Sequence, residues 1–539
     1  MFSDEMNPTQ PRALPLHGLP LVLICLVYLL AGLIDHDPWK PDDAVHLGVA
    51  WEFAQHGDWL TPRLADSAWF GAPPLYHWVA ALLGQAFEFT LPFHAGARLA
   101  SALFGALALL AIGGAVRTLH GPVAARGTPL LLIGTLGLLT PIHDAQPAIA
   151  LLAAQALLLF GLARMAERPL ASGLTAALGV GLGIFAQGSP ALPLLTLPLL
   201  LAPLHPQWRS RRALGGIALA LLLGLLLAGL WPALLAWQAP AQLDRWIAIE
   251  AGRMSFAHLN VDNLQDHFEL LAWGAWPLLP LGLWALWGYR RQLGNPAFFL
   301  PLLVSLLALA QVLLTTAPQP LQHLPLYIPL ALLAAAGVEK LRRGAANAFD
   351  WFGTMTFTLV AGLIWLGGIS MITGEPARVA KNFLKAEPGF VAELSWPALI
   401  AAALLTACWI WAMAGLAKSP WRSVTHWAAG MALTWGLIAT LWMPWIDYGK
   451  TYRPVAQSLQ KALADSDDCV AARGLGDPQK ASLRYFIDLK LRTPRKSRDC
   501  GWLLVQGGRV ETQPAGWRKV WEGNRPGDKS ERLRLYRRS

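Results

Sequence analysis

The sequence predicts a mainly α-helical protein with many membrane spans, followed by a small α/β domain. Of its 539 residues, 55% are apolar and 14% are charged, whereas a soluble protein carries about 25% charged residues. Apolar runs long enough to cross roughly 30 Å of hydrocarbon recur along the chain. From Ile446 onward the composition becomes that of a soluble domain. We therefore expect a transmembrane domain over 1–445 and a soluble domain over 446–539.

Apolar length and breaks at Pro and Gly place the individual spans. Leu16 to Ile34 has no small-residue cleavage site after it, so it is expected to be a retained first span and not a removed signal. The runs predict thirteen spans. They lie near 16–34, 98–116, 128–141, 145–165, 171–186, 190–204, 213–236, 268–288, 297–315, 322–341, 351–373, 396–417 and 425–445.

Loop charge predicts the orientation, because short loops rich in Lys and Arg remain in the cytoplasm. Alternate loops are basic, and all of them fall on one side of the predicted spans. We therefore expect a cytoplasmic amino terminus, and the odd number of spans then puts the C-terminal domain outside. The basic residues are Arg117 with Arg126, Arg164 with Arg168, Arg209 with Arg211 and Arg212, Arg290 with Arg291, Lys340 with Arg342 and Arg343, and Lys418 with Arg422.

The C-terminal domain is predicted to combine short strands with one helix. Residues 469–476 and 501–508 have the apolar runs of buried strands, 480–491 the pattern of a helix, and 531–538 that of an edge strand. Residues 446–539 contain 20 Lys and Arg against 11 Asp and Glu, a net charge of +9. This charge suits contact with anionic headgroups or an anionic glycan. A solvated basic surface without a ligand is the open alternative.

Two of the four cysteines are predicted to form a disulfide. Cys469 and Cys500 each lie beside a predicted strand on the oxidising side of the membrane. Closing that loop would stabilise a small domain by roughly 3 to 4 kcal/mol. Cys25 and Cys408 lie in spans and are expected to be inert packing residues. The tail has no CxxC pair, which disfavours zinc there.

The first outer loop, residues 35–97, contains two adjacent carboxylates, Asp42 and Asp43, and two predicted interfacial helices. One helix runs from Asp43 to His56, and a second, aromatic one lies within 69–87. One interpretation of Asp42 is an N-cap for the first helix. The other is a general base, because partial desolvation raises a carboxylate pKa and helps it take a proton from a hydroxyl. The residues alone leave both open.

Short motifs follow one another in this loop, and their order resembles a known family. They are Pro41-Asp42-Asp43, Gly57-Asp58-Trp59, Phe70-Gly71-Ala72-Pro73-Pro74-Leu75 and His77-Trp78, with Arg98 in "ARLASAL" beyond them. The loop is similar to that of the GT-C class of glycosyltransferases, which use lipid-linked sugars. Within that class it resembles the aminoarabinose transferases that modify lipid A and the bacterial protein O-mannosyltransferase superfamily. Softer matches are Asp144 in "HDAQPAIALL", Glu250 with Arg253 in "IEAGRM", and 321–337.

The resemblance implies a GT-C fold and a glycosyltransferase in the bacterial inner membrane, with the C-terminal domain in the periplasm. The donor would be a polyprenyl phosphate-linked sugar, such as an undecaprenyl one. The acceptor would be a hydroxyl or phosphate of lipid A, another envelope glycan or a protein. Asp42 would activate the acceptor for displacement at the anomeric carbon with inversion, through an oxocarbenium-like transition state. Membrane lipids are further partners, and no nucleic acid is expected.

The resemblance also implies a set of site residues. The chain departs from the family at Ala72 and Gln187, where lysines that face the donor phosphate would stand. The expected catalytic carboxylates are Asp42, Asp43 and Asp144. The expected phosphate-binding residues are Arg253, then Arg63, Arg98 and His323, because cations stabilise charge that grows on a leaving phosphate. Other expected pocket residues are Glu250, Trp59, Tyr76, His77, Trp78 and Gln187.

Several alternatives stay open for these residues. Arg253 could be an interfacial arginine that only snorkels, and Asp144 a cap for a helix that begins at Ala145. No cofactor is indicated beyond a divalent ion held by Asp42 with His46 or His143. The missing lysines fit other phosphate-binding cations, a different donor lipid or lost turnover. We favour the first, because carboxylates at a membrane surface are costly to keep without a function.

Two rival functions come from other classes. A transporter would need charged residues along a path inside the spans, whereas here Asp and Glu are nearly absent from span interiors and gather at one face. A non-catalytic protein that binds sugar-lipids or glycans would share the fold and the loop but lack turnover.

Overall fold

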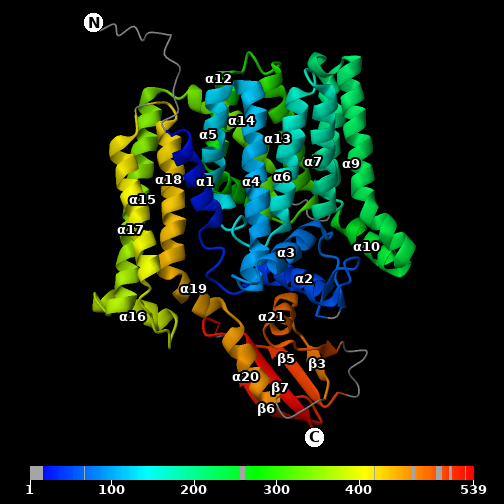
Figure 1. The fold of residues 1–539 in the computed structure, drawn as a ribbon, viewed down its shortest axis with the longest axis vertical. Helices are drawn as coiled ribbons and strands as arrows, with labels where there is room; N and C mark the ends of the chain where they lie inside the picture. Colours follow the sequence, from blue (N-terminus) through cyan, green and yellow to red (C-terminus); the bar gives the residue numbers. More distant parts are fainter. Residues whose placement is uncertain are drawn as a thin grey trace.

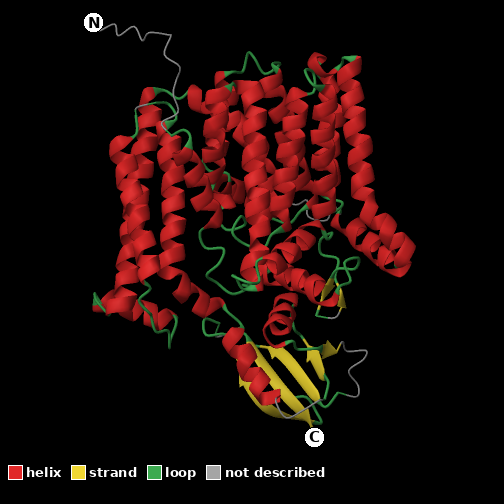
Figure 2. Cartoon of the chain, viewed as in Figure 1, coloured by secondary structure: helices red, strands yellow, loops and turns green. Residues whose placement is uncertain are grey.

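The computed structural model is a bundle of long helices with a small sheet domain at one end (Figures 1 and 2). It describes residues 16–65, 67–254, 261–417, 419–463, 468–492, 500–508, 513–528 and 530–539. Lys418, which was assigned to a basic loop, lies outside the described residues.

Apolar helices make up the bundle, as the sequence predicts. In the described residues, nine helices are long and apolar enough to cross a membrane. Helices α1 (Leu19–Leu30), α5 (Pro122–Ile133) and α8 (Ala191–Leu201) are apolar but shorter. The count of thirteen spans stays a prediction. The long helices are α4 (Phe93–His120), α6 (Pro147–Arg164), α7 (Pro169–Gln187), α9 (Arg211–Gln238), α13 (Pro296–Thr315), α14 (Leu324–Glu339) with the turn before it, α15 (Arg343–Thr373), α17 (Trp396–Gly415), and α18 (Arg422–Leu437) continued by α19 (Met443–Lys450) and α20 (Arg453–Leu463).

One predicted span is broken. The expected helix at 268–288 is divided into α11 (Val261–Gly274) and α12 (Leu278–Gly288), which meet at an angle of 92°. Pro277 lies at the break, where its ring and missing N–H prevent the α-helix from continuing. The segment expected as one span is therefore sharply bent within its length.

Short helices lie across the end of the bundle that faces the sheet domain (Figure 1). Helix α2 (Asp42–His56) and helix α3 (Leu75–Ala86) come from the 35–97 loop, close to where the apolar pattern puts them. A small hairpin of β1 (Arg63–Leu64) and β2 (Ser67–Ala68) lies between them. Two further short helices were not predicted: α10 (Pro240–Arg253), which extends α9, and α16 (Ala377–Ala386), which follows α15.

The C-terminal domain contains a five-stranded sheet within the described residues, in the order β4-β3-β5-β7-β6. Strands β3 (Val470–Arg473) and β5 (Trp502–Gly507) are the buried strands that were predicted. The predicted edge strand is β7 (Arg532–Arg538), and it is wrong as an edge because β5 and β6 (Trp517–Gly523) pair with its two sides. The structure joins Cys469 to Cys500 by a disulfide. Strand β4 (Leu491–Arg492) pairs with the outer side of β3.

The sheet domain contacts the 35–97 loop through helix α21 (Asp477–Ile487), which packs on α2 (Figure 1). Gly48 of α2 allows the close approach, because a Cβ built there would lie 2.8 Å from the Cβ of Ala481. Any larger residue at position 48 would push the two helices apart. The domain therefore rests directly on the helix that begins at Asp42.

Candidate active site

Asp43 forms a fully buried ion pair with Arg98 of α4. The Arg98 Nη2 lies 2.7 Å from Oδ2 of Asp43, and Nε lies 3.0 Å from Oδ1. The Asp43 carboxylate also accepts from the backbone N–H groups of Trp39, at 3.0 Å, and Ala145, at 2.8 Å. Burial disfavours the ionised form, but the Arg98 charge and its hydrogen bonds prevail and hold the pKa of Asp43 at about 2.

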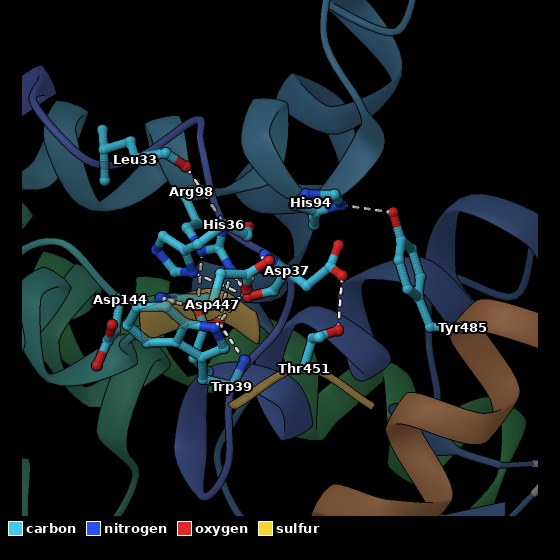
Figure 3. A network of polar contacts seen from close by, with 12 residues as sticks. Leu33, His36, Asp37, Trp39, His94, Arg98, Asp144, Asp447, Thr451 and Tyr485 are labelled. Carbon is cyan, nitrogen blue, oxygen red and sulfur yellow. Dashed lines mark hydrogen bonds and ion pairs between the residues drawn. The ribbon is translucent and has the colours of Figure 1, made fainter. Parts of the chain in front are cut away.

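This pair corrects the phosphate-binding role that was predicted for Arg98. All three nitrogens of the Arg98 guanidinium donate hydrogen bonds. Besides Asp43, they reach the carbonyls of Leu33, His36 and Asp37 at 2.8 to 3.2 Å. The Arg98 side chain is 0% exposed, so it does not bind a donor phosphate. The Asp43 carboxylate is likewise saturated with partners, and its charge helps to raise the pKa of Asp42, as expected of a neighbouring carboxylate. Figure 3 shows Arg98 at the centre of this network.

Asp42, one residue earlier, is in a different situation. It is the first residue of α2 after Pro41, it is half-buried, and its side chain makes no cap hydrogen bond. In the part of the chain that the structure describes, no hydrogen bond or ion pair of this carboxylate is present, so the N-cap interpretation is wrong. Burial and then the neighbouring Asp43 charge raise the pKa of Asp42. The two adjacent carboxylates thus differ, since Asp43 is held in a buried ion pair and Asp42 has no such partner.

Asp144 lies next to this network, just before α6. Burial and then the Asp43 charge raise its pKa to about 7. The interpretation of Asp144 as a helix cap is wrong, because α6 begins at Pro147 and its N-cap is Gln146, whose side chain accepts from the N–H of Ala148. In Figure 3 the Asp144 carboxylate points away from the Arg98 guanidinium. The Asp144 backbone carbonyl accepts from the Ser101 hydroxyl at 2.6 Å.

A cavity of about 360 Å³ is lined by Gln146, two residues after Asp144, and by residues from several other segments. Ala72, Gln187 and Arg253, which are far apart in the sequence, all line it. His46 of α2 lines it as well, one helical turn after Asp42 and therefore on the same helix face. The two positions at which the chain departs from the family lysines thus face the same space as the retained arginine.

Arg253 is held in place by Glu250. The two side chains form an ion pair at 2.9 Å, one turn apart near the end of α10. The other Glu250 oxygen accepts from the N–H of Ser189 at 2.6 Å, and the Ser189 hydroxyl donates to the Glu250 carbonyl at 3.0 Å. Glu250 therefore ties α10 to the turn after α7. With this anchor the Arg253 side chain lines the cavity, which differs from an interfacial arginine that only snorkels towards water.

Two predicted phosphate-binding residues lie elsewhere. Arg63 is half-exposed, pairs with Asp58 at 3.5 Å and does not line the cavity. His323 is buried, with its Nε2 3.2 Å from Nδ1 of His267 and its Nδ1 3.1 Å from the Gln319 carbonyl. Both ring nitrogens are therefore engaged. Among the predicted cations, the cavity contains Arg253.

The predicted aromatic pocket residues mostly pack the loop. The Trp78 indole N–H donates to the Trp59 carbonyl at 2.9 Å, and Trp59 stacks on Phe53. The Tyr76 hydroxyl lies 2.7 Å from the Ser101 hydroxyl. None of these rings lines the cavity. They pack within the loop, so the structure does not place them among the pocket residues as expected.

His77 reaches the site through another histidine. Its Nε2 lies 3.0 Å from Nδ1 of the cavity residue His46. Burial lowers the pKa of His46 to about 4 and lowers the pKa of His77 well below its ordinary value, so both rings are neutral near pH 7. The second histidine proposed as a metal ligand, His143, has both ring nitrogens on backbone carbonyls, those of Leu139 and Tyr28. Among the described residues, no three His, Cys, Asp or Glu side chains gather as metal ligands.

Sequence reasoning missed most of the polar lining of the cavity. Side-chain amides approach it from the ends of several helices, and a Gln at the end of an apolar run is too common to signal a site. The missed lining residues are Gln146, Gln311, Gln319, Gln322, Thr315 and Thr316.

The architecture and the site together define a class. An apolar helix bundle with free carboxylates, a polar cavity and a covering α/β domain at one end is that of an integral membrane glycosyltransferase of the GT-C class. The fold matches the crystal structure of ArnT from Cupriavidus metallidurans bound to undecaprenyl phosphate, with a TM-score of 0.69 over 96% of this chain and 97% of that one, at 17% identity.

Relatives in sequence narrow the class to a family. The undecaprenyl phosphate-alpha-4-amino-4-deoxy-L-arabinose arabinosyl transferase of Pseudomonas aeruginosa LESB58 is 30% identical over 440 residues, which cover 79% of this chain and 75% of the relative. The like-named enzyme 2 of Sodalis glossinidius is 29% identical over 73% of each chain. No family model matches the sequence. The chain belongs to this arabinosyl transferase family and is a glycosyltransferase.

Proposed function

We propose that the protein transfers a sugar from undecaprenyl phosphate to a hydroxyl or phosphate of lipid A, another envelope glycan or a protein. All three of these acceptor classes are kept in the proposal. Relatives named for an undecaprenyl phosphate donor, and the fold shared with a structure bound to that lipid, support the donor lipid. The polar cavity at the end of the bundle supports a reaction at the membrane surface.

We place this reaction on the periplasmic face of the inner membrane. Basic loops support a cytoplasmic amino terminus. The Cys469–Cys500 disulfide supports an oxidising compartment for the C-terminal domain, which we begin at 446. Helix α2, which begins at Asp42, lies at the same end of the bundle as that domain (Figure 1).

Asp42 is assigned as the general base. It takes the proton of the acceptor hydroxyl, the oxygen attacks the anomeric carbon, and the bond from that carbon to the lipid phosphate oxygen breaks with inversion. Undecaprenyl phosphate leaves. The observation that carries this assignment is the Asp42 carboxylate, which is partly desolvated and has no partner. It lies one helical turn before His46 of the cavity wall, whereas the neighbouring Asp43 is paired with Arg98.

Arg253 is assigned to the leaving phosphate. Its ion pair with Glu250 fixes its position before the donor arrives, so little reorganisation accompanies the growth of negative charge. The amide groups around it supply neutral hydrogen-bond donors in place of the two lysines that are absent at Ala72 and Gln187.

The test is transfer by the purified full-length protein in lipid nanodiscs with undecaprenyl phosphate-linked sugars and lipid A. Asp42→Asn should lower the transfer rate by about 10² to 10⁴, the range typical of a lost general base, and should retain binding of undecaprenyl phosphate. Asp58→Asn, in the same loop and outside the cavity, is the matched control and should transfer at the parent rate. An Asp42→Asn enzyme as fast as the parent would overturn the assignment.

A further inference from the structure

A second cavity, here called the α12–α15 groove, lies between helix α12 with the turn before it and the first turns of α15. Its volume is about 390 Å³, and every described residue that lines it is apolar. Helix α12 lies at the end of the bundle opposite the sheet domain (Figure 1). Helix α2, which carries the proposed base, lies at the other end. The groove is therefore separate from the candidate active site.

Two contacts join the walls of the α12–α15 groove. The rings of Trp276 and Phe349 meet edge to face, with their centroids 6.3 Å apart. The Trp284 indole N–H donates to the Lys340 carbonyl at 3.2 Å. Ala345, which lines the groove from α15, is exposed and too small to fill the space. An apolar chain in the groove would cover these side chains.

Two cations flank one lining residue of the groove. Lys340 and Arg342 come directly before and after Leu341, and both are exposed. The Lys340 ammonium lies 4.8 Å from the centre of the Tyr289 ring, and such rings are typical of the level of lipid headgroups. Neither cation forms an ion pair with a carboxylate among the residues that the structure describes. Both charges are therefore available to a ligand.

The carboxylates near the groove already have partners. Asp350 follows the lining residue Phe349, and its carboxylate lies 2.6 Å from Nδ1 of His426 and 3.5 Å from Nε of Arg422. Glu339, at the end of α14, is not free either. An anionic group beside Leu341 would therefore meet cations and no unpaired carboxylate.

We propose that the α12–α15 groove binds one acyl chain of an anionic phospholipid, with Lys340 and Arg342 on its phosphate. Basic residues beside an apolar cleft between membrane helices are the chemistry that recognises such a lipid. The proposed orientation places this lipid in the cytoplasmic leaflet. Undecaprenyl phosphate is not the proposed occupant, because the proposed function puts its phosphate beside Arg253 of α10, near the other end of the bundle (Figure 1).

Native mass spectrometry of the delipidated full-length protein tests this site. The protein in detergent is titrated with phosphatidylglycerol, with phosphatidylcholine of the same chains, and with undecaprenyl phosphate. Each Lys or Arg near an anionic headgroup contributes roughly fivefold, so phosphatidylglycerol should bind at least about tenfold more tightly than phosphatidylcholine. The double variant Lys340→Gln, Arg342→Gln should lose most of this preference. Arg211→Gln with Arg212→Gln, at the start of α9 on the far side of the bundle (Figure 1), is the matched control and should retain it.

A second variant tests the groove without changing its charge. Ala345→Trp should fill the groove and weaken phosphatidylglycerol binding at least as much as the double charge variant. Asn347→Trp, exposed on the same helix and outside the lining, should bind as the parent does. Equal affinity of the parent for the two phospholipids would overturn the inference, as would unchanged binding in Ala345→Trp. Undecaprenyl phosphate that binds more tightly than phosphatidylglycerol and is lost in Ala345→Trp would also overturn it.

Discussion

Arg484 of helix α21 donates a hydrogen bond of 2.9 Å to the Glu52 carboxylate of α2, and both side chains are almost fully buried. The bond joins the C-terminal domain to the helix that begins at Asp42. Lys40, just before α2, forms a second ion pair with the domain, with its Nζ 3.0 Å from Asp528. The domain therefore holds the loop that carries the proposed base.

Removing the Glu52 charge should loosen this contact. Glu52→Gln leaves the Arg484 cation buried with a weaker partner, and breaking a buried pair costs about 3 to 5 kcal/mol. Hydrogen exchange should rise in both α2 and α21. Glu88→Gln, an exposed substitution in the same loop, is the control and should leave exchange unchanged. Equal protection of α21 in Glu52→Gln and parent would show that the pair does not hold the domain.

The different roles of Asp42 and Asp43 lead to a second prediction. Asp43→Asn removes the partner of the fully buried Arg98, so it should lower the thermal unfolding temperature, with a loss of roughly 3 kcal/mol or more. Asp42→Asn, at a carboxylate without a partner whose pKa is raised, should unfold at or slightly above the parent temperature at neutral pH, while the transfer rate falls. Thermal unfolding of the two purified variants in one detergent makes the comparison. Equal unfolding temperatures would contradict the role of Asp43 as an anchor.

Much of the bundle could be predicted, because apolar length identifies membrane helices without knowledge of their packing. The placement of α2 and α3 followed from local periodicity and from the stop at Gly57. The division of labour between Asp42 and Asp43 could not be predicted. Successive helix residues point about 100° apart, and only the position of α4 shows which of the two meets Arg98.

Long-range pairing explains the other errors. Strand β7 has the alternating charges of an edge strand, but the order of strands places it between β5 and β6. The motif around Arg98 resembles that of a phosphate-binding arginine. In the structure, however, its guanidinium donates to carbonyls of the segment before α2. Cavity glutamines come from helices far apart in the chain, so no local spacing marks them.

Arg253 should matter for the chemical step more than for acceptor binding. Arg253→Ala removes the cation from the leaving phosphate, and loss of one such group costs about 10² to 10³ in kcat. The KM for the acceptor should change little, because the proposed contact is with the donor. Steady-state transfer with varied acceptor measures both constants. Arg245→Ala, on the exposed face of the same α10 helix, is the matched control. Equal kcat in Arg253→Ala and parent would refute the assignment.

The raised pKa of Asp144 leads us to expect that the stability of the protein depends on pH. Its pKa in the folded protein is raised to about 7 from 3.8, by burial and by Asp43. A raised pKa means that the folded state binds this proton more tightly than the unfolded state, so the contribution is fully present below pH 3.8 and is lost as the pH rises to about 7. Asp144→Asn should therefore be more stable than the parent at pH 8 and no more stable at pH 4. Unfolding temperatures of both proteins across this range check the sign, and a difference that does not grow with pH would contradict the raised pKa.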